Sequence, residues 1–408
     1  MHIINKNNKV MGGKSMKGVK NKRGISLIVL VITIIVMIIL AAAIILSLNS
    51  SDVIGKANEA KTSSDAANKK AAASVLLAEY ELAVVNGETT KTPNEYVKEG
   101  LEAQGIDASD MFITEDREIL IGLSKVAVAF SEAGVQIGDT VTGYTLSQDA
   151  SAKTYTTSGK ENATIFDEEN YEYIEDDPQP ATISRNDENN QITWEYFGID
   201  ETGNALIVGS VTTSSPQITL AGKGGYLNGP AELDAVCKAM YSSDMGTARS
   251  IDLDDVTRVL EYTGEKGSYT DIDGNEIQTE EPLTIGEISK LLGTSLSGST
   301  PDGKDISEYK SDCYIINKTN DAKEYNTAMQ SVIFTTQQYW LSSSCSFANF
   351  AEDNADFFIY NCNFRGVDTN WMFAAYEYSD GNMTAIRPVV SLNSSVQVAY
   401  DGTTVTLS

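Results

Sequence analysis

Residues 25–46 read ISLIVLVITIIVMIILAAAIIL, a run without a charged side chain. As a helix that rises about 1.5 Å per residue, the run would be about 33 Å long, which matches the roughly 30 Å hydrocarbon core of a bilayer. The apolar region of a secretory signal peptide is shorter, about 7–15 residues, and a small-residue cleavage site follows it. No such site follows residue 46. We therefore expect this run to cross a membrane once.

The segment before this run is basic and ends in a glycine. Residues 1–24 hold seven Lys and Arg residues and no acid, and the junction reads KRGISLI, with Gly24 directly before Ile25. This junction resembles the class III signal of type IV prepilins. The resemblance implies that a prepilin peptidase cuts between Gly24 and Ile25, that the leader stays cytoplasmic, and that the retained helix contacts other pilin subunits. An ordinary signal anchor is the alternative, and Met11 or Met16 could also be the true start.

One position departs from the pilin pattern. Pilins of this family usually carry Glu at the fifth position after the cut, whereas this chain has Val29. Valine favours membrane insertion, because an uncompensated Glu is costly in hydrocarbon, but it removes one docking interaction between subunits. Both a major and a minor subunit fit this departure.

The helical pattern continues beyond the apolar run. Residues 25–85 contain no Pro and one Gly, and Asn86 with Gly87 forms a credible stop. Four apolar residues recur at helical spacing and predict one buried face: Leu76, Leu77, Tyr80 and Val84. We expect residues 25–87 to form one transmembrane and stem helix.

A short mixed segment follows at residues 88–136. Pro93 opens a helical pattern that ends at Gly105, and MFITEDREILIGL (111–123) predicts two short strands around an acidic turn. So small a unit needs a packing partner, so we expect a small pilin-like head against the stem.

Residues 137–408 combine a Thr-, Ser-, Gly- and Tyr-rich strand pattern with three helical segments. These segments are AELDAVCKAMY (231–241), IDLDDVTRVLEY (251–262) and TIGEISKLLG (284–293), the last of which opens with a capping box of Thr284 and Glu287. Together with the stem helix and the head, the patterns predict an α+β fold class.

Charge and histidine content narrow the classes of function. Beyond residue 24 the chain has 23 basic and 57 acidic residues, which repel phosphate groups, so we expect no nucleic-acid partner. Eight of the acids lie in residues 161–177, where we expect a solvated loop and where a calcium or cationic-partner site is the alternative. His2 is the only histidine, and cleavage would remove it. We therefore expect no enzyme, no metal site and no cofactor.

The last quarter of the chain is dense in aromatic and small polar side chains. QYWLSSSC (338–345) opens the tract, ADFFIYN (355–361) lies within it, and IRPVVSL (386–392) closes it. Such a composition is typical of binding surfaces, because rigid aromatics supply contact area at low entropic cost. The tract resembles the C-type-lectin-like domain of ligand-binding proteins diversified by retroelements, a fold shared with formylglycine-generating enzymes.

The resemblance implies that Trp340 and Arg387 belong to the scaffold and that residues between them contact a ligand. The residues assigned to ligand contact are Phe347, Asn349, Phe350, Asp356, Phe358, Tyr360, Asn363, Asp368, Asn370, Trp371, Phe373, Tyr376 and Tyr378. Five residues in the tract cannot arise by adenine mutagenesis of an Asn codon, which leaves active diversification open: Glu352, Trp371, Met372, Glu377 and Met383.

Alternation in ADFFIYN predicts which side chains face a ligand. Residues 355, 357 and 359 should face the core, and Asp356, Phe358 and Tyr360 should face solvent. The alternative is a twisted sheet in which both sets are core residues.

These features predict a surface-exposed type IV pilin-like subunit that displays a lectin-like domain to a protein or glycan. The subunit would span the membrane before assembly, with its C-terminal domain extracellular. A purely structural pilus or pseudopilus subunit of a type II secretion-like system, without a specific ligand, is the alternative. An enzyme of the formylglycine-generating type would need paired reactive cysteines, for which Cys345 and Cys362 are the candidates.

Overall fold

The structure is a computed structural model of the 408-residue chain. It describes residues 53–408 apart from short gaps at 147–151, 157–160, 168–169, 176–179, 186–191, 265–267, 271–272, 279–281, 295, 297, 299, 313–315, 350–353 and 375–381. The predicted cleavage site at Gly24 and Ile25 and the apolar run at 25–46 lie outside the described residues.

The first described helix is α2 (Val53–Val85), which ends at the predicted stop, where Gly87 has a left-handed φ of 72°. Lys, Asp and Glu recur along α2, and no helix among the described residues is long and apolar enough to span a membrane. The predicted fold class, which starts with a transmembrane and stem helix over 25–87, is therefore wrong in this respect. The described chain is α+β with mixed sheets and starts at a charged helix.

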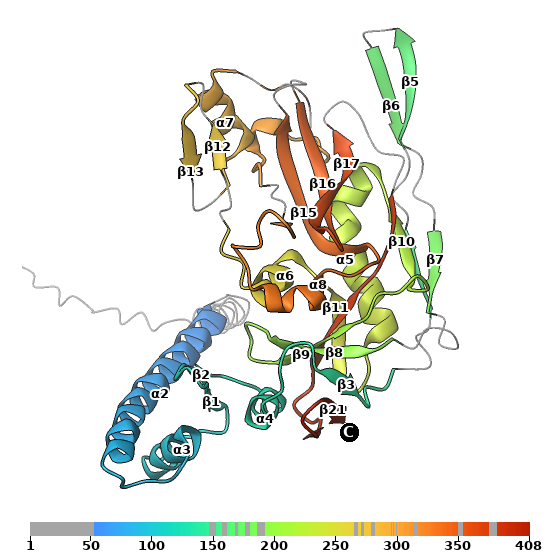
Figure 1. The fold of residues 1–408 in the computed structure, drawn as a ribbon. Helices are drawn as coiled ribbons and strands as arrows, with labels where there is room; N and C mark the ends of the chain where they lie inside the picture. The colour runs from blue at the N-terminus through green and yellow to red at the C-terminus, as the bar shows by residue number, and fades with distance from the viewer. Residues whose placement is uncertain are drawn as a thin grey trace, which may run out of the picture. The chain divides into compact units, whose positions relative to one another are not determined.

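A small head packs on the C-terminal half of α2. Helix α3 (Pro93–Ala103) and the antiparallel strands β1 (Met111–Ile113) and β2 (Ile119–Ile121) form it, which confirms the predicted elements (Figure 1). Their common core consists mainly of Ala73, Leu76, Leu77, Tyr80, Val97, Leu101, Met111 and Ile113. Val84 was expected in this core but is exposed, because Ala83 takes the inward position.

A seven-stranded mixed sheet joins distant parts of the chain. Its strands, in spatial order, are β11 (Gly246–Ser250), β19 (Pro388–Leu392), β9 (Ala205–Gly209), β8 (Trp194–Ile199), β3 (Thr140–Thr142), β21 (Thr404–Leu407) and β20 (Val398–Tyr400). Parallel pairing of β3 with β21 puts the last strand beside the first one of this sheet.

A second, six-stranded sheet carries the aromatic tract. Its strands, in spatial order, are β10 (Gln217–Leu220), β18 (Asn382–Ala385), β15 (Tyr339–Asn349), β16 (Asn354–Asn363), β17 (Gly366–Ala374) and β14 (Ile316–Asn317). We call β15, β16 and β17 the ribbon.

Three further strand pairs lie outside these sheets. They are β4 (Ala152–Thr156) with β7 (Pro180–Ser184), β5 (Glu161–Asp167) with β6 (Asn170–Glu175), and β12 (Ser268–Thr270) with β13 (Glu276–Gln278). The acidic segment expected to be a loop thus forms most of a hairpin. Its strands contain Thr, Ile, Phe and Tyr, which favour β structure, and this tendency outweighs the charge.

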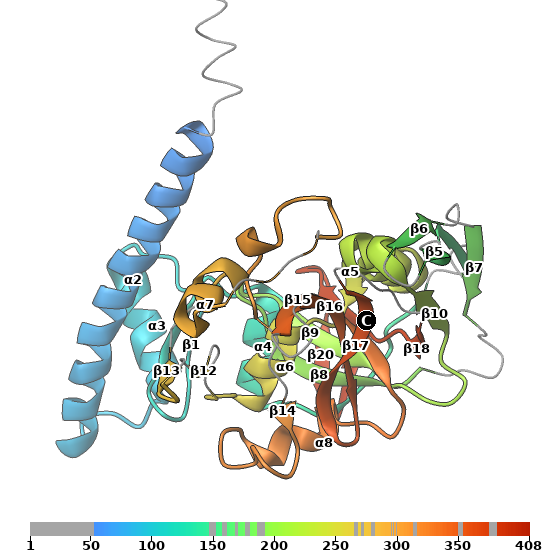
Figure 2. The same cartoon turned by 90° about the horizontal axis from the view of Figure 1, so that it is seen from above.

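Helices cover the ribbon and the sheets. They are α4 (Lys125–Ala133), α5 (Gly222–Tyr241), α6 (Leu253–Leu260), α7 (Ile285–Leu292) and α8 (Gln330–Ile333), with 3-10 turns η2 (Ile306–Glu308) and η3 (Thr327–Met329). The capping box predicted for α7 is confirmed, since Glu287 N donates to Thr284 Oγ1 at 3.2 Å. Figures 1 and 2 show α5 alongside the ribbon, which it contacts along all three strands.

Two hydrophobic cores meet at the ribbon. One core contains Phe357 and Ile359 together with Leu233 and Val236 of α5. The other contains residues of α6, α8 and the opposite ribbon face, including Tyr360. The ribbon is therefore held from both sides, and this position determines which of its residues can reach a ligand.

Candidate recognition surface

The predicted inward face of β16 is confirmed. Ala355, Phe357 and Ile359 are completely buried, and the Phe357 ring makes edge contacts with Tyr226 and Tyr309 at centroid distances of 5.1 and 5.3 Å. This packing anchors the strand on the side of α5.

The opposite face of β16 changes character along its length. Asp356 and Phe358 are half-buried, whereas Tyr360 is only 1% exposed and its hydroxyl donates to the Asp312 carbonyl oxygen at 3.2 Å. The prediction that Tyr360 faces solvent is therefore wrong. The second core covers this face of the ribbon at Tyr360, which alternation within one strand could not reveal.

Four of the assigned residues occupy neighbouring register positions where the second core covers this face less completely than at Tyr360. Phe358 still packs against that core, and for Trp371 the structure describes the strand position only. Phe347, which is 48% exposed, lies opposite Asp356, and Phe358 lies opposite Trp371. Cross-strand partners share a face of an antiparallel sheet, and Asp356 and Phe358 are two residues apart on one strand. We call these four positions the distal patch.

Three further assigned residues lie elsewhere on the ribbon. Asn363 lies at the turn between β16 and β17, Asp368 lies near that turn on β17, and Asn370 lies opposite Ile359, on the other face from Phe358. For Asn349 and Phe373 the structure describes the strand positions only. Phe350, Tyr376 and Tyr378 lie outside the described residues.

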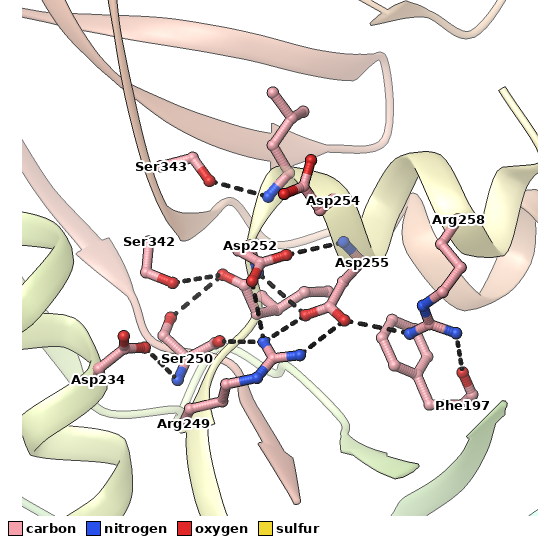
Figure 3. A network of polar contacts seen from close by, with 12 residues as sticks. Phe197, Asp234, Arg249, Ser250, Asp252, Asp254, Asp255, Arg258, Ser342 and Ser343 are labelled. Carbon is pink, nitrogen blue, oxygen red and sulfur yellow. Dashed lines mark hydrogen bonds and ion pairs between the residues drawn. The ribbon is translucent and has the colours of Figure 1, made fainter. Parts of the chain in front are cut away.

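A polar network connects α6 to the part of β15 around Ser342 and Ser343, which we call the base of the ribbon (Figure 3). The sequence did not suggest these residues as a unit. The register of β15 with β16 shifts between Trp340 and Ser344. Within this irregular stretch, Ser343 Oγ accepts a hydrogen bond from Leu253 N at 3.0 Å, and Ser342 N donates to the Ile251 carbonyl oxygen at 2.9 Å. Ser342 and Ser343 thus supply hydrogen-bond partners for backbone groups at and just before the start of α6.

Charged residues extend this network. The Asp255 carboxylate, with a side chain that is 4% exposed, accepts from Arg249 Nη2 at 2.8 Å and from Arg258 Nη2 at 3.1 Å. Burial alone would raise the pKa of Asp255, but the hydrogen bonds and charges of the two arginines lower it. Burial and the nearby Asp255 carboxylate raise the pKa of Asp252 to about 6. The sequence signal for this network was the spacing of Asp252 and Asp255, which form a capping box on α6.

The two residues assigned to the scaffold are buried. Trp340 Nε1 donates to the Ile218 carbonyl oxygen at 3.1 Å, and the Arg387 side chain donates to groups on three separate segments. Their burial agrees with the scaffold role that the resemblance implied.

The cysteines differ in state. Cys345 is disulfide-bonded, whereas Cys237 and Cys362 are free and buried, and Cys313 lies outside the described residues. Burial raises the pKa of the Cys362 thiol to about 12, so Cys362 is not a reactive thiolate at neutral pH. Cys345 and Cys362, the candidates for a pair of reactive cysteines, are therefore not bonded to each other. Across the described residues no group of three or more His, Cys, Asp or Glu side chains could hold a metal ion.

Comparison of the chain with protein-family models, with curated proteins and with solved structures gives no match.

Proposed function

We propose that this chain is a pilin-like subunit whose C-terminal domain binds a protein or glycan through the distal patch. The observation that carries the proposal is the exposed Phe347 ring beside Asp356 on a ribbon that two cores hold in place. An aromatic side chain on a rigid strand loses little conformational entropy on binding, which favours affinity.

The proposed location rests on the sequence and on one cysteine. The basic leader, Gly24 and the uncharged run at 25–46 support processing by a prepilin peptidase, passage through the membrane before assembly with other subunits, and an extracellular C-terminal domain. The disulfide at Cys345 supports an oxidising compartment, because disulfides are rare in the cytosol.

A structural subunit without a ligand is the second candidate. Burial of Tyr360 favours it, since part of the aromatic tract serves the core.

The test is binding of the full chain to a panel of immobilised glycans and purified cell-surface proteins. Phe347→Ser should weaken any specific binding by at least about thirtyfold, the effect of losing a hot-spot aromatic worth about 2 kcal/mol. Phe364→Ser is the matched control, because Phe364 is 52% exposed but lies at the turn between β16 and β17. Equal losses in both variants would contradict the distal patch, and no specific binding to any member of the panel would favour the structural subunit.

A further inference from the structure

The distal patch combines aromatic residues with a negative charge. Phe347 is 48% exposed, and the half-buried Asp356 lies directly opposite it in the register of β15 and β16. Phe358 is the next residue of β16 on the same face, and its cross-strand partner is Trp371. Three of the four positions therefore carry an aromatic residue, and the fourth carries a carboxylate.

The charge of this part of the chain has one sign. Strands β15, β16 and β17 contain no Lys or Arg in their sequence. From residue 338 to residue 386 the chain has six acids and one base, Arg365, which lies at the turn between β16 and β17. Asp356 pairs with Ala374 at the other end of these two strands. The ribbon sequence thus places its negative charge beside the aromatic residues of the distal patch and its one nearby base at the far turn.

A further base, Lys310, belongs to a segment on the other edge of β15. Residues 310–312 hydrogen-bond to that edge: Ser346 N donates to Asp312 Oδ1, and Asp312 N donates to the Ser346 carbonyl oxygen, both at 2.9 Å. β15 therefore separates the backbone of this segment from β16, which carries Asp356.

We propose that the distal patch binds an arginine side chain on the surface of a partner protein. The inference rests on the proposed function and names the group that the same surface would take. A cation is attracted to the face of an aromatic ring within about 6 Å of its centroid, and a guanidinium also forms paired hydrogen bonds with a carboxylate. Opposed strand residues have Cβ atoms about 4.5–5.5 Å apart, so one guanidinium can contact both Phe347 and Asp356.

The chemistry of the patch favours arginine over other occupants. A guanidinium is planar, so it stacks on a ring while its edge faces a carboxylate, and arginine is enriched in protein interfaces. A neutral sugar has no charge that complements Asp356. A second copy of this chain fits less well than a basic partner, because beyond residue 24 the chain has 23 basic and 57 acidic residues.

A pair of synthetic peptides tests the charge without any change to the protein. The purified full chain in a nonionic detergent is titrated with a Gly-Ser peptide that carries arginines, and with the same peptide in which uncharged citrulline replaces each arginine. The arginine peptide should bind at least about tenfold more tightly, the lower end of the effect of close charge pairs across protein interfaces. Its affinity should fall as the salt concentration rises from about 50 to about 300 mM.

Substitutions then locate the site. Asp356→Asn should weaken binding of the arginine peptide at least about tenfold and leave binding of the citrulline peptide unchanged. Glu201→Gln is the control for net charge, because Glu201 is exposed in the turn between β8 and β9 of the other sheet, and it should change the affinity by less than about twofold. Phe347→Leu keeps an apolar side chain but removes the ring, so it should weaken binding, whereas Phe347→Trp should preserve it. Thermal melts show that each variant is folded.

The outcomes separate this inference from the proposed function. The inference fails if the two peptides bind equally, if neither binds, or if Glu201→Gln weakens binding as much as Asp356→Asn does. Binding of chitosan, a cationic glycan, in place of the arginine peptide would also overturn it. If Phe347→Ser abolishes binding to a member of the panel but arginine and citrulline peptides bind equally, the proposed function stands and the arginine ligand does not.

Discussion

Replacement of Arg387 by Met should destabilise the domain that carries the ribbon by about 3 kcal/mol. Arg387 is buried, and its guanidinium donates to the carbonyl oxygens of Gly209 at 3.0 Å and Val332 at 2.7 Å and to the Tyr339 hydroxyl at 3.0 Å. The guanidinium carbon also lies 4.9 Å from the centroid of the Tyr339 ring. Among the described residues it forms no ion pair with a carboxylate.

The magnitude follows from the groups left behind. Two buried carbonyl oxygens without a donor cost about 1–3 kcal/mol each, and loss of a buried cation–π contact adds about 2 kcal/mol. Removal of a buried charge that has no ion-pair partner among the described residues returns several kcal/mol of desolvation energy, so the net loss falls well below the sum. Met has nearly the volume of Arg, although it is shorter, which limits the additional cavity.

Urea denaturation followed by tryptophan fluorescence measures this loss. Arg365→Met is the control, because Arg365 is exposed at the turn between β16 and β17 and should change stability by less than about 0.5 kcal/mol. Arg387→Lys should fall between the wild type and Arg387→Met, since an ammonium group cannot reach all of the acceptors at once. A loss below about 1 kcal/mol for Arg387→Met, or an equal loss for Arg365→Met, would refute the reasoning.

Three further predictions concern Asp252, the ribbon and the cysteines. Because the pKa of Asp252 in the folded state is about 6, the stability that its protonated form contributes is full below pH 4 and is lost as the pH rises through 6. Denaturation curves across this pH range should show that Asp252→Asn removes about 1–2 kcal/mol of the pH dependence. This is less than the full pKa shift would give, because the Asp252 side chain is 31% exposed. Tyr360→Ser should lower the free energy of unfolding by about 3–5 kcal/mol, and Phe358→Ser should lower it clearly less. Equal losses of stability in thermal melts would show that this face of the ribbon is covered along its whole length. Alkylation of the native chain without reductant should leave Cys345 and Cys362 unlabelled, and alkylation after unfolding should label Cys362 alone of the two; labelling of Cys345 would contradict its disulfide.

Local signals in the sequence predicted local structure well. The end of α2 at Asn86 and Gly87, the hairpin of β1 and β2, and the capping box at Thr284 all depend on residues within a few positions of one another. The parallel pairing of β3 with β21 depends on contacts across most of the chain, such as Thr142 with Val405, and no local pattern encodes it.

At the candidate recognition surface too, local patterns were predictable from the sequence, whereas contacts with distant segments were not. Alternation correctly predicted that Phe357 points into a core, because period-two geometry belongs to the strand itself. It could not predict whether another element covers the opposite face, and α6 with α8 and the segment at Asp312 does so at Tyr360. The network of Arg249, Asp252 and Asp255 was missed for a similar reason, since its role depends on Ser342 and Ser343 of a strand far along the chain.

The partial cover of the ribbon separates stability from recognition along a single strand. Phe358 and Tyr360 share a face and are about 7 Å apart, yet Tyr360 belongs to the second core and Phe358 only borders it. Substitutions near the ribbon base therefore act on folding, whereas those at Phe347 act on a surface that the folded domain already presents. Under the proposed function, a change in ligand preference can then arise at the distal patch with little cost to the fold.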